Sequence, residues 1–212
     1  SPARCIVQFA ITDCHARGDF CWYPNQIDAP ANAPLCDLTK CQPIRFPNTF
    51  GRMDYPMDEY NLWPRFESTA IAEEWLNTHL ETFVTEQDIA ALKGTGATHM
   101  RVPLPHYILG KDETVDDPAW IVGKRWQAFQ KLVRWARKYD LQVWPDIHSA
   151  PGSQNGFDNS GHQSNHITCV HWSRNPAHVE RSIQVLEQVT AQIAAEGMTD
   201  VVTGLGLLNE PF

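Results

Sequence analysis

The strongest constraint on the fold is an alternation of two hydrophobic patterns that begins at about residue 67. Segments with apolar residues every three to four positions, the spacing of a helix, precede short apolar runs at 98–104, 141–148 and 201–208. Strands separated by helices pair in parallel, because each helix carries the chain back to the start of the next strand. The sequence therefore predicts an α/β fold with parallel strands and crossover helices.

Two helices are predicted before the first strand. The first presents one face formed by Ala72, Trp75, Leu76, His79 and Leu80. Thr85 and Asp88 have the spacing of a capping box, in which each side chain bonds the backbone N–H of the other residue. They precede a second helix that carries Ile89 and Leu92 and ends near Gly94.

Two further helices are predicted between the later strands. One starts at Asp116 or Asp117 with Pro118 in its first turn, and the other starts at Pro176 behind Asn175. The expected buried stripe of the first is Val122, Trp126, Phe129, Val133 and Ala136. That of the second is Val179, Ile183, Leu186, Thr190 and Ile193.

The beginning of the chain has a different composition. Prolines interrupt every candidate periodicity there, and five of the six cysteines fall in the first 41 residues. None forms a CxxC pair, which argues against a zinc site, and disulfides in an extracellular protein or free thiols both fit. We therefore divide the chain into an irregular Cys/Pro-rich segment, residues 1–56, and a main domain, residues 57–212.

Charge and hydropathy exclude several partners. The formal net charge is −8 and Lys and Arg form no runs, so nucleic acid and anionic membrane surfaces are poor partners. No apolar run approaches the ~18 residues that a membrane-spanning helix needs, so no membrane span is expected.

Polar side chains accompany each predicted strand. Arg101 lies in the first, Asp146 and His148 in the second, and Asn209 and Glu210 follow the third. Parallel strands bring their carboxyl ends to one edge, where α/β proteins bind ligands. Each residue could instead cap its own strand, but three strands in succession favour a shared site.

Four motifs in this region resemble glycoside hydrolase family 5, most closely its exo-β-1,3-glucanase branch. They are HLETFVTEQD, HMRVPL, VWPDIHSAPGSQNGFDNSG and LLNEP, and the resemblance runs from about Met57 to the end. It implies a partial (β/α)8 TIM barrel in which the three strands are the second, third and fourth. It also implies retaining hydrolysis by two carboxylic acids about 5 to 5.5 Å apart.

The resemblance implies roles for individual residues. Glu210 would be the acid/base, a role that needs a carboxyl group protonated near the working pH. Asn209 would bond the sugar 2-hydroxyl, Arg101 would keep the nucleophile ionised, and His148 would orient the sugar.

Further side chains are expected around the sugar. Phe157 would offer an apolar face, unless it only packs within its loop, and Asp158 and Asn159 would supply hydrogen bonds. Trp126 and Trp144 are assigned to the core. No cofactor is implied, the substrate would be β-linked glucan, most simply β-1,3-glucan, and the full-length protein would be a monomer outside the cell or at the cell wall.

Two departures from the family pattern change the expectation for this chain. The Gly-Gly-Trp segment of the first barrel strand is absent, and the nucleophile would lie beyond Phe212. A complete barrel typically needs about 250 residues. The chain is therefore expected to be a fragment that is inactive alone.

Two rival functions fit parts of the sequence. A metal-dependent hydrolase would use His162, His166 and His171 together with Asp146 and His148, although the segment around these histidines has no helical stripe. A non-catalytic, carbohydrate-binding or wall-associated homologue would explain the missing nucleophile.

Overall fold

The computed structural model of the chain describes residues 58–162 and 171–211. The Cys/Pro-rich segment 1–56 and all six cysteines lie outside the described residues, so the predictions about disulfides do too. The described elements, in chain order, are α2 (Glu59–Leu62), the 3-10 turn η2 (Trp63–Arg65), α3 (Thr69–Thr82), α4 (Glu86–Gly94), β1 (His99–Leu104), α5 (Arg125–Lys138), β2 (Gln142–Ile147), the 3-10 turn η3 (Asp158–Ser160) and α6 (Pro176–Ala195).

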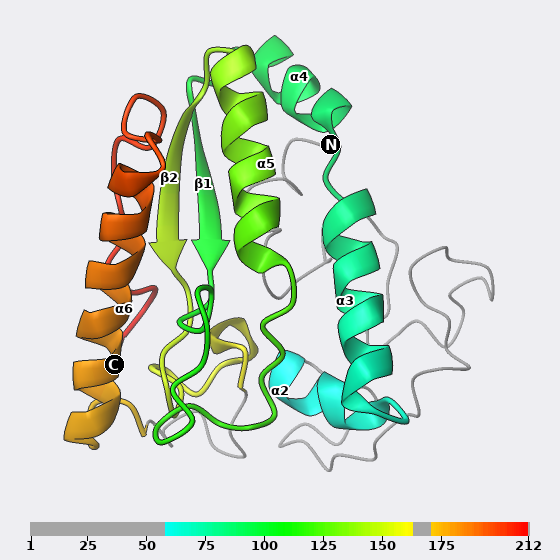
Figure 1. Cartoon of the computed structure of the whole chain (residues 1–212). Coiled ribbons are helices and arrows are strands. Elements are labelled where there is room, and N and C mark those ends of the chain that lie inside the picture. The colour runs from blue at the N-terminus through cyan, green and yellow to red at the C-terminus, as the bar shows by residue number, and fades with distance from the viewer. Residues whose placement is uncertain (1–57, 163–170, 212) are drawn as a thin grey trace.

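β1 and β2 lie side by side and run in the same direction, with α5 connecting them (Figure 1). Their register places His99 opposite Gln142 and Leu104 opposite Ile147. Both strands therefore end at one edge, and the loops that follow them gather below the arrowheads in Figure 1. The predicted parallel arrangement is confirmed for these two strands.

The core lies between the sheet and the helices α4, α5 and α6. Met100, Val102 and Val143 point into it, because alternate residues of a strand face opposite sides of the sheet. The helices contribute a matching set of apolar side chains: Ile89, Leu92, Phe129, Leu132, Val133, Ala136, Val185, Val189 and Ile193. Burying a side chain of this size stabilises the fold by about 1.5–3 kcal/mol.

The opposite face of the sheet carries Arg101 and Trp144, both exposed. Trp126 lies in the core as predicted, but the assignment of Trp144 to the core is wrong, since this residue is 49% exposed. Its place in the pleat points it away from α5 and α6, and its indole N–H donates to Thr203 Oγ1 at 3.0 Å.

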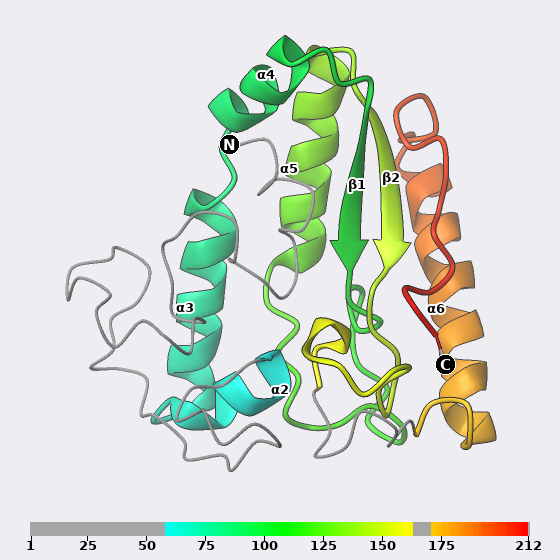
Figure 2. The same ribbon diagram turned by 180° about the vertical axis from the view of Figure 1, so that it is seen from behind.

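The third predicted strand, 201–208, is only partly confirmed. The segment lies parallel to β2 but makes two isolated bridges, Val143 with Val202 and Asp146 with Gly206, instead of a continuous strand. Three steps along β2 match four along this segment, so it contains one extra residue, as a β-bulge does. Figure 2 shows the segment in red beside β2.

The helices before β1 agree with the sequence. α3 buries Ala72 and Leu76, and α4 starts with the predicted capping box between Thr85 and Asp88. A second apolar cluster joins α2, η2 and α3, with Leu62, Trp63 and Phe66 among its members.

The predicted start of α5 is wrong, because the helix begins at Arg125 and not at Pro118. Asp117 accepts a hydrogen bond from Ala119 N in a local turn, and Asp116 is engaged by Arg181 of α6. These carboxylates therefore do not cap a helix.

α6 begins at Pro176 behind an Asn175 cap, as predicted. Its buried apolar side chains are Val185, Val189 and Ile193, whereas the predicted Ile183 is 46% exposed. The buried face is thus rotated by about one residue, which also brings Arg181 inward. In the described ranges no helix is long and apolar enough to cross a membrane.

Candidate active site

Asp146 is the hub of the polar side chains at the carboxyl edge of the sheet. Its Oδ1 accepts from Arg101 Nη2 at 2.8 Å, and its Oδ2 contacts His148 Nδ1 at 2.6 Å. Because Arg101 lies on β1 and Asp146 lies diagonally across from it on β2, the parallel register brings them together. The structure therefore joins Arg101 and His148 through Asp146, to which the family resemblance assigned no role.

The carboxyl group of Asp146 is almost fully buried, with 6% of its side chain exposed. Burial alone would raise its pKa, but the hydrogen bonds and charges of His148 and Arg101 outweigh burial and hold the pKa below its usual value. Asp146 is therefore a carboxylate at neutral pH.

Arg101 connects Asp146 to the segment after α6. The same Nη2 that contacts Asp146 also donates to Asn209 Oδ1 at 2.7 Å. Asn209 is buried, and its backbone N–H donates to Ile147 O at 2.9 Å. Asn209 thus contacts Arg101, which Asp146 in turn connects to His148, in agreement with the expectation that the polar residues of three successive segments meet at one edge.

Glu210 lies at the outer side of this group. It is exposed, and its Oε2 accepts a hydrogen bond from Asn159 Nδ2 at 2.8 Å. Its φ of 46° is in the left-handed region, which is uncommon for a residue other than glycine. Such a conformation costs about 1–3 kcal/mol and persists only where the surroundings hold it.

Gln154 holds the backbone on both sides of the group. Its Nε2 donates to His148 O at 2.9 Å and to Asn209 O at 3.0 Å, and its Oε1 accepts from Ala150 N at 3.1 Å. Gln154 is fully buried, so all three bonds replace contacts with water. The loop after β2 and the segment of Glu210 are therefore fixed to each other.

The other loop residues predicted to bind substrate lie in or beside η3. Phe157 and Asp158 are half-buried, and Asp158 Oδ1 accepts from the backbone N–H of Asn159. Asn159 contacts a candidate catalytic residue, since its Nδ2 donates to Glu210 Oε2.

A buried network close to this edge was missed by the sequence reasoning. Ser149 Oγ lies 2.8 Å from His106 Nδ1, His106 Nε2 lies 3.5 Å from Asp116 Oδ1, and Arg181 donates to Asp116 Oδ2 at 3.0 Å. Burial is the main cause that lowers the pKa of His106 to about 3, and the charge of Arg181 acts in the same direction. No local motif announces these contacts, because their members come from four separate segments.

The alternative of a metal-dependent hydrolase can be compared with the structure except at His166, which lies outside the described residues. His162 stacks on Tyr60 with ring centroids 3.6 Å apart, and residues 58–162 and 171–211 contain no cluster of three potential metal ligands. His148 Nδ1 is taken up by Asp146.

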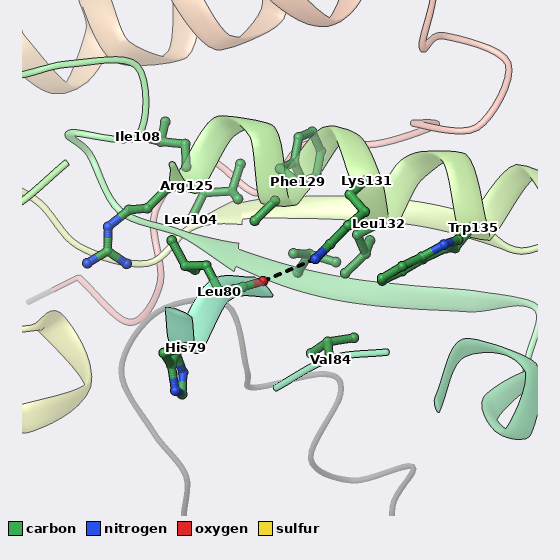
Figure 3. A pocket seen from close by; sticks show the side chains of 12 residues that line it. His79, Leu80, Val84, Leu104, Ile108, Arg125, Phe129, Lys131, Leu132 and Trp135 are labelled. Carbon is green, nitrogen blue, oxygen red and sulfur yellow. Dashed lines mark hydrogen bonds between the residues drawn. The ribbon is translucent and has the colours of Figure 1, made fainter. Parts of the chain in front are cut away.

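An apolar pocket lies away from these residues, between α3, β1 and α5 (Figure 3). Leu104, Phe129 and Leu132 line it, and Lys131 Nζ at its side donates to Leu80 O at 3.3 Å. None of the candidate site residues borders this pocket, and apart from His79, Arg125 and Lys131 the side chains that line it are apolar or aromatic.

Comparisons with known proteins point to one class of enzyme. The chain is 33% identical over 173 residues to a glucan 1,3-β-glucosidase of Pichia angusta, and the aligned region covers 81% of this chain and 38% of the relative. It is 31% identical over 216 residues to glucan 1,3-β-glucosidase 2 of Wickerhamomyces anomalus, and this alignment covers 100% of this chain and 47% of the relative. No protein-family model matches the chain.

A comparison with solved structures supports the fold. The structure superposes on the crystal structure of a rutinosidase from Aspergillus niger with a TM-score of 0.64 and 24% sequence identity. The match covers 73% of this chain and 40% of the rutinosidase chain. The two relatives described above are glucan 1,3-β-glucosidases, and this chain spans less than half of the length of each.

Proposed function

We propose that this chain is the N-terminal part of a retaining glycoside hydrolase of family 5 that cleaves β-linked glucan, most simply β-1,3-glucan. The main support is the position of Asn209 and Glu210 beside the cluster of Arg101, Asp146 and His148. The similarity to glucan 1,3-β-glucosidases supports the substrate class.

In this proposal Glu210 is the acid/base that protonates the leaving-group oxygen and later activates water. Asn209 donates from its amide to the sugar 2-hydroxyl, and His148 and Asn159 orient the sugar, with Phe157 and Asp158 next to them. The nucleophile comes from a part of the (β/α)8 barrel beyond this chain, and Arg101 helps to keep it ionised.

A chain with one of two catalytic carboxylates forms no covalent glycosyl intermediate, so we expect the 212 residues alone to be inactive. A polymeric glucan does not cross a membrane, which supports an extracellular or cell-wall location. Binding of β-1,3-glucan oligosaccharides by the isolated chain without turnover, with no longer gene product in the source organism, would favour a non-catalytic carbohydrate-binding protein instead.

The test is the hydrolysis of β-1,3-glucan by the longer gene product. We expect Glu210→Gln to lower kcat/KM by about 10²- to 10⁴-fold, the usual contribution of general acid-base catalysis. Glu187→Gln, a matched change at an exposed position of α6, should leave kcat/KM unchanged. A Glu210→Gln enzyme as active as the Glu187→Gln enzyme would refute the role of Glu210.

A further inference from the structure

The two oxygens of Asp146 serve two different partners. Oδ1 faces Arg101 and Oδ2 faces His148, at 2.8 and 2.6 Å. The carboxylate has little room to rotate, since Gly206 packs against it: a Cβ at Gly206 would stand 2.8 Å from Oδ1 and 3.2 Å from the Asp146 Cα. Asp146 is therefore held in one orientation by the chain on both sides.

This orientation fixes the tautomer of His148. An ionised carboxylate can only accept hydrogen bonds, so the Nδ1 that faces it must carry a proton. In a neutral imidazole the other nitrogen, Nε2, is then an acceptor.

The same carboxylate fixes the orientation of an amide through Arg101. Arg101 Nη2 can only donate, so the Asn209 atom 2.7 Å away is the acceptor Oδ1. The two N–H groups of Asn209 Nδ2 then point away from Arg101. The edge consequently presents an acceptor, His148 Nε2, and a donor, Asn209 Nδ2.

We propose that Asp146 is a positioning residue, which holds His148 as the Nδ1–H tautomer and Arg101 against Asn209, so that the site offers one imidazole acceptor and one amide donor to neighbouring sugar hydroxyls. The part about sugar rests on the proposed function, whereas the part about the tautomer rests on the contacts of Asp146 alone. Asp146 acts through its neighbours and touches no substrate.

Asp146→Asn tests the tautomer because Arg101 determines how the new amide is oriented. Arg101 has no acceptor, so the asparagine must turn its Oδ1 to Arg101. Its Nδ2 then faces His148. His148 Nδ1 must then become the acceptor, so the proton moves to Nε2.

The measurement is the ¹⁵N NMR spectrum of the histidine rings of the 212-residue chain near pH 7.5, with the His148 signals assigned by their loss in His148→Gln. We expect Nδ1–H in the wild type and Nε2–H in Asp146→Asn, while Asp200→Asn, an exposed carboxylate paired with Arg137, keeps Nδ1–H. Asp146→Ala, which offers neither donor nor acceptor, should give a mixture of tautomers and serves if the asparagine variant does not fold. An unchanged Nδ1–H tautomer in either variant would overturn the proposal.

A second readout links the tautomer to the sugar. In the longer gene product, Asp146→Asn should lower kcat/KM for a β-glucoside about 10²-fold, the scale of a misplaced contact. A series of monodeoxy aryl β-glucosides removes the sugar hydroxyls one at a time. For the substrate that lacks the hydroxyl contacted by His148, kcat/KM of the wild type should fall. The kcat/KM of Asp146→Asn, which has already lost this contact, should fall little further.

The two readouts separate the two claims. The predicted tautomers without any glucosidase activity would refute the proposed function and keep the role of Asp146. The role of Asp146 would be refuted, and the proposed function kept, if Asp146→Asn had full glucosidase activity and lost as much kcat/KM as the wild type with every deoxy substrate.

Discussion

At the scale of single residues, the site is a chain of acceptors and donors that starts at a buried charge. Asp146 is ionised in spite of its burial, and it orders Arg101 and His148. Arg101 in turn orients the side-chain amide of Asn209, which precedes Glu210 in the sequence. The exposed Glu210 therefore directly follows Asn209, whose side chain is oriented through Arg101 by the buried Asp146.

The buried His106 gives a prediction about pH. Its pKa in the folded chain is about 3, well below the ordinary value of 6.5, so between these two pH values the unfolded chain binds a proton that the folded chain does not. Folded stability from this group is complete above pH 6.5 and is lost as the pH falls. From pH 7 to pH 5 the loss should be about 2 kcal/mol.

Urea unfolding of the wild type and His106→Asn at pH 7 and pH 5 measures this effect. The difference in unfolding free energy between the two proteins should shrink by about 2 kcal/mol at the lower pH. A difference that is the same at both pH values would mean that His106 titrates normally in the folded chain.

The sequence predicted which residues meet at the edge but not how they pair. Arg101, His148, Asn209 and Glu210 could be assigned to one edge because parallel strands end together. The role of Asp146 became visible only with the register, which places Arg101 close enough to share its carboxylate. Sequence spacing alone contains no information on that diagonal contact.

At the scale of elements, the loop after β2 and the segment after α6 act as one unit. Backbone bonds from Gly206 and Asn209 to the β2 strand and to its end hold the segment in place, and Gln154 closes the unit from the loop side. The bulge between Val202 and Gly206 shifts the register by one residue, which sets where Asn209 and Glu210 emerge.

Gln154→Leu should break this unit. It removes the partners of three backbone groups in a fully buried environment, and a buried unpaired group costs about 1–3 kcal/mol. We expect a loss of about 3 kcal/mol in unfolding free energy, measured by urea denaturation, because relaxation and entering water offset part of the sum. The control Gln188→Leu changes an exposed glutamine of α6 and should alter stability by less than about 0.5 kcal/mol. Equal stability of the two variants would show that Gln154 does not hold the loop.

Element types were predictable here, and element limits were not. The capping box of α4 and the Asn-Pro start of α6 are local signals, and both are present. The start of α5 was missed because Asp116 is used by Arg181, which lies 65 residues away in the sequence. The buried face of α6 was misplaced for the same reason, since the inward position of Arg181 depends on that contact.

At the scale of the whole molecule, helices cover one face of the sheet, whereas Trp144 and Arg101 on the other face are exposed. A (β/α)8 barrel would enclose this face, because its strands close into a cylinder around it. The relatives are more than twice as long as the part they share with this chain, which supports the proposal that further strands complete the barrel.

The most direct test of the central claim is the dependence of the Glu210→Gln enzyme on its leaving group, measured with the longer gene product. An acid/base protonates the leaving oxygen, so its loss matters only where protonation is needed. We expect Glu210→Gln to lower kcat/KM for β-1,3-glucan by at least about 10²-fold and to retain nearly wild-type kcat/KM for the glycosylation step with 2,4-dinitrophenyl β-glucoside. Equal losses on both substrates would contradict the assignment of Glu210 as the acid/base.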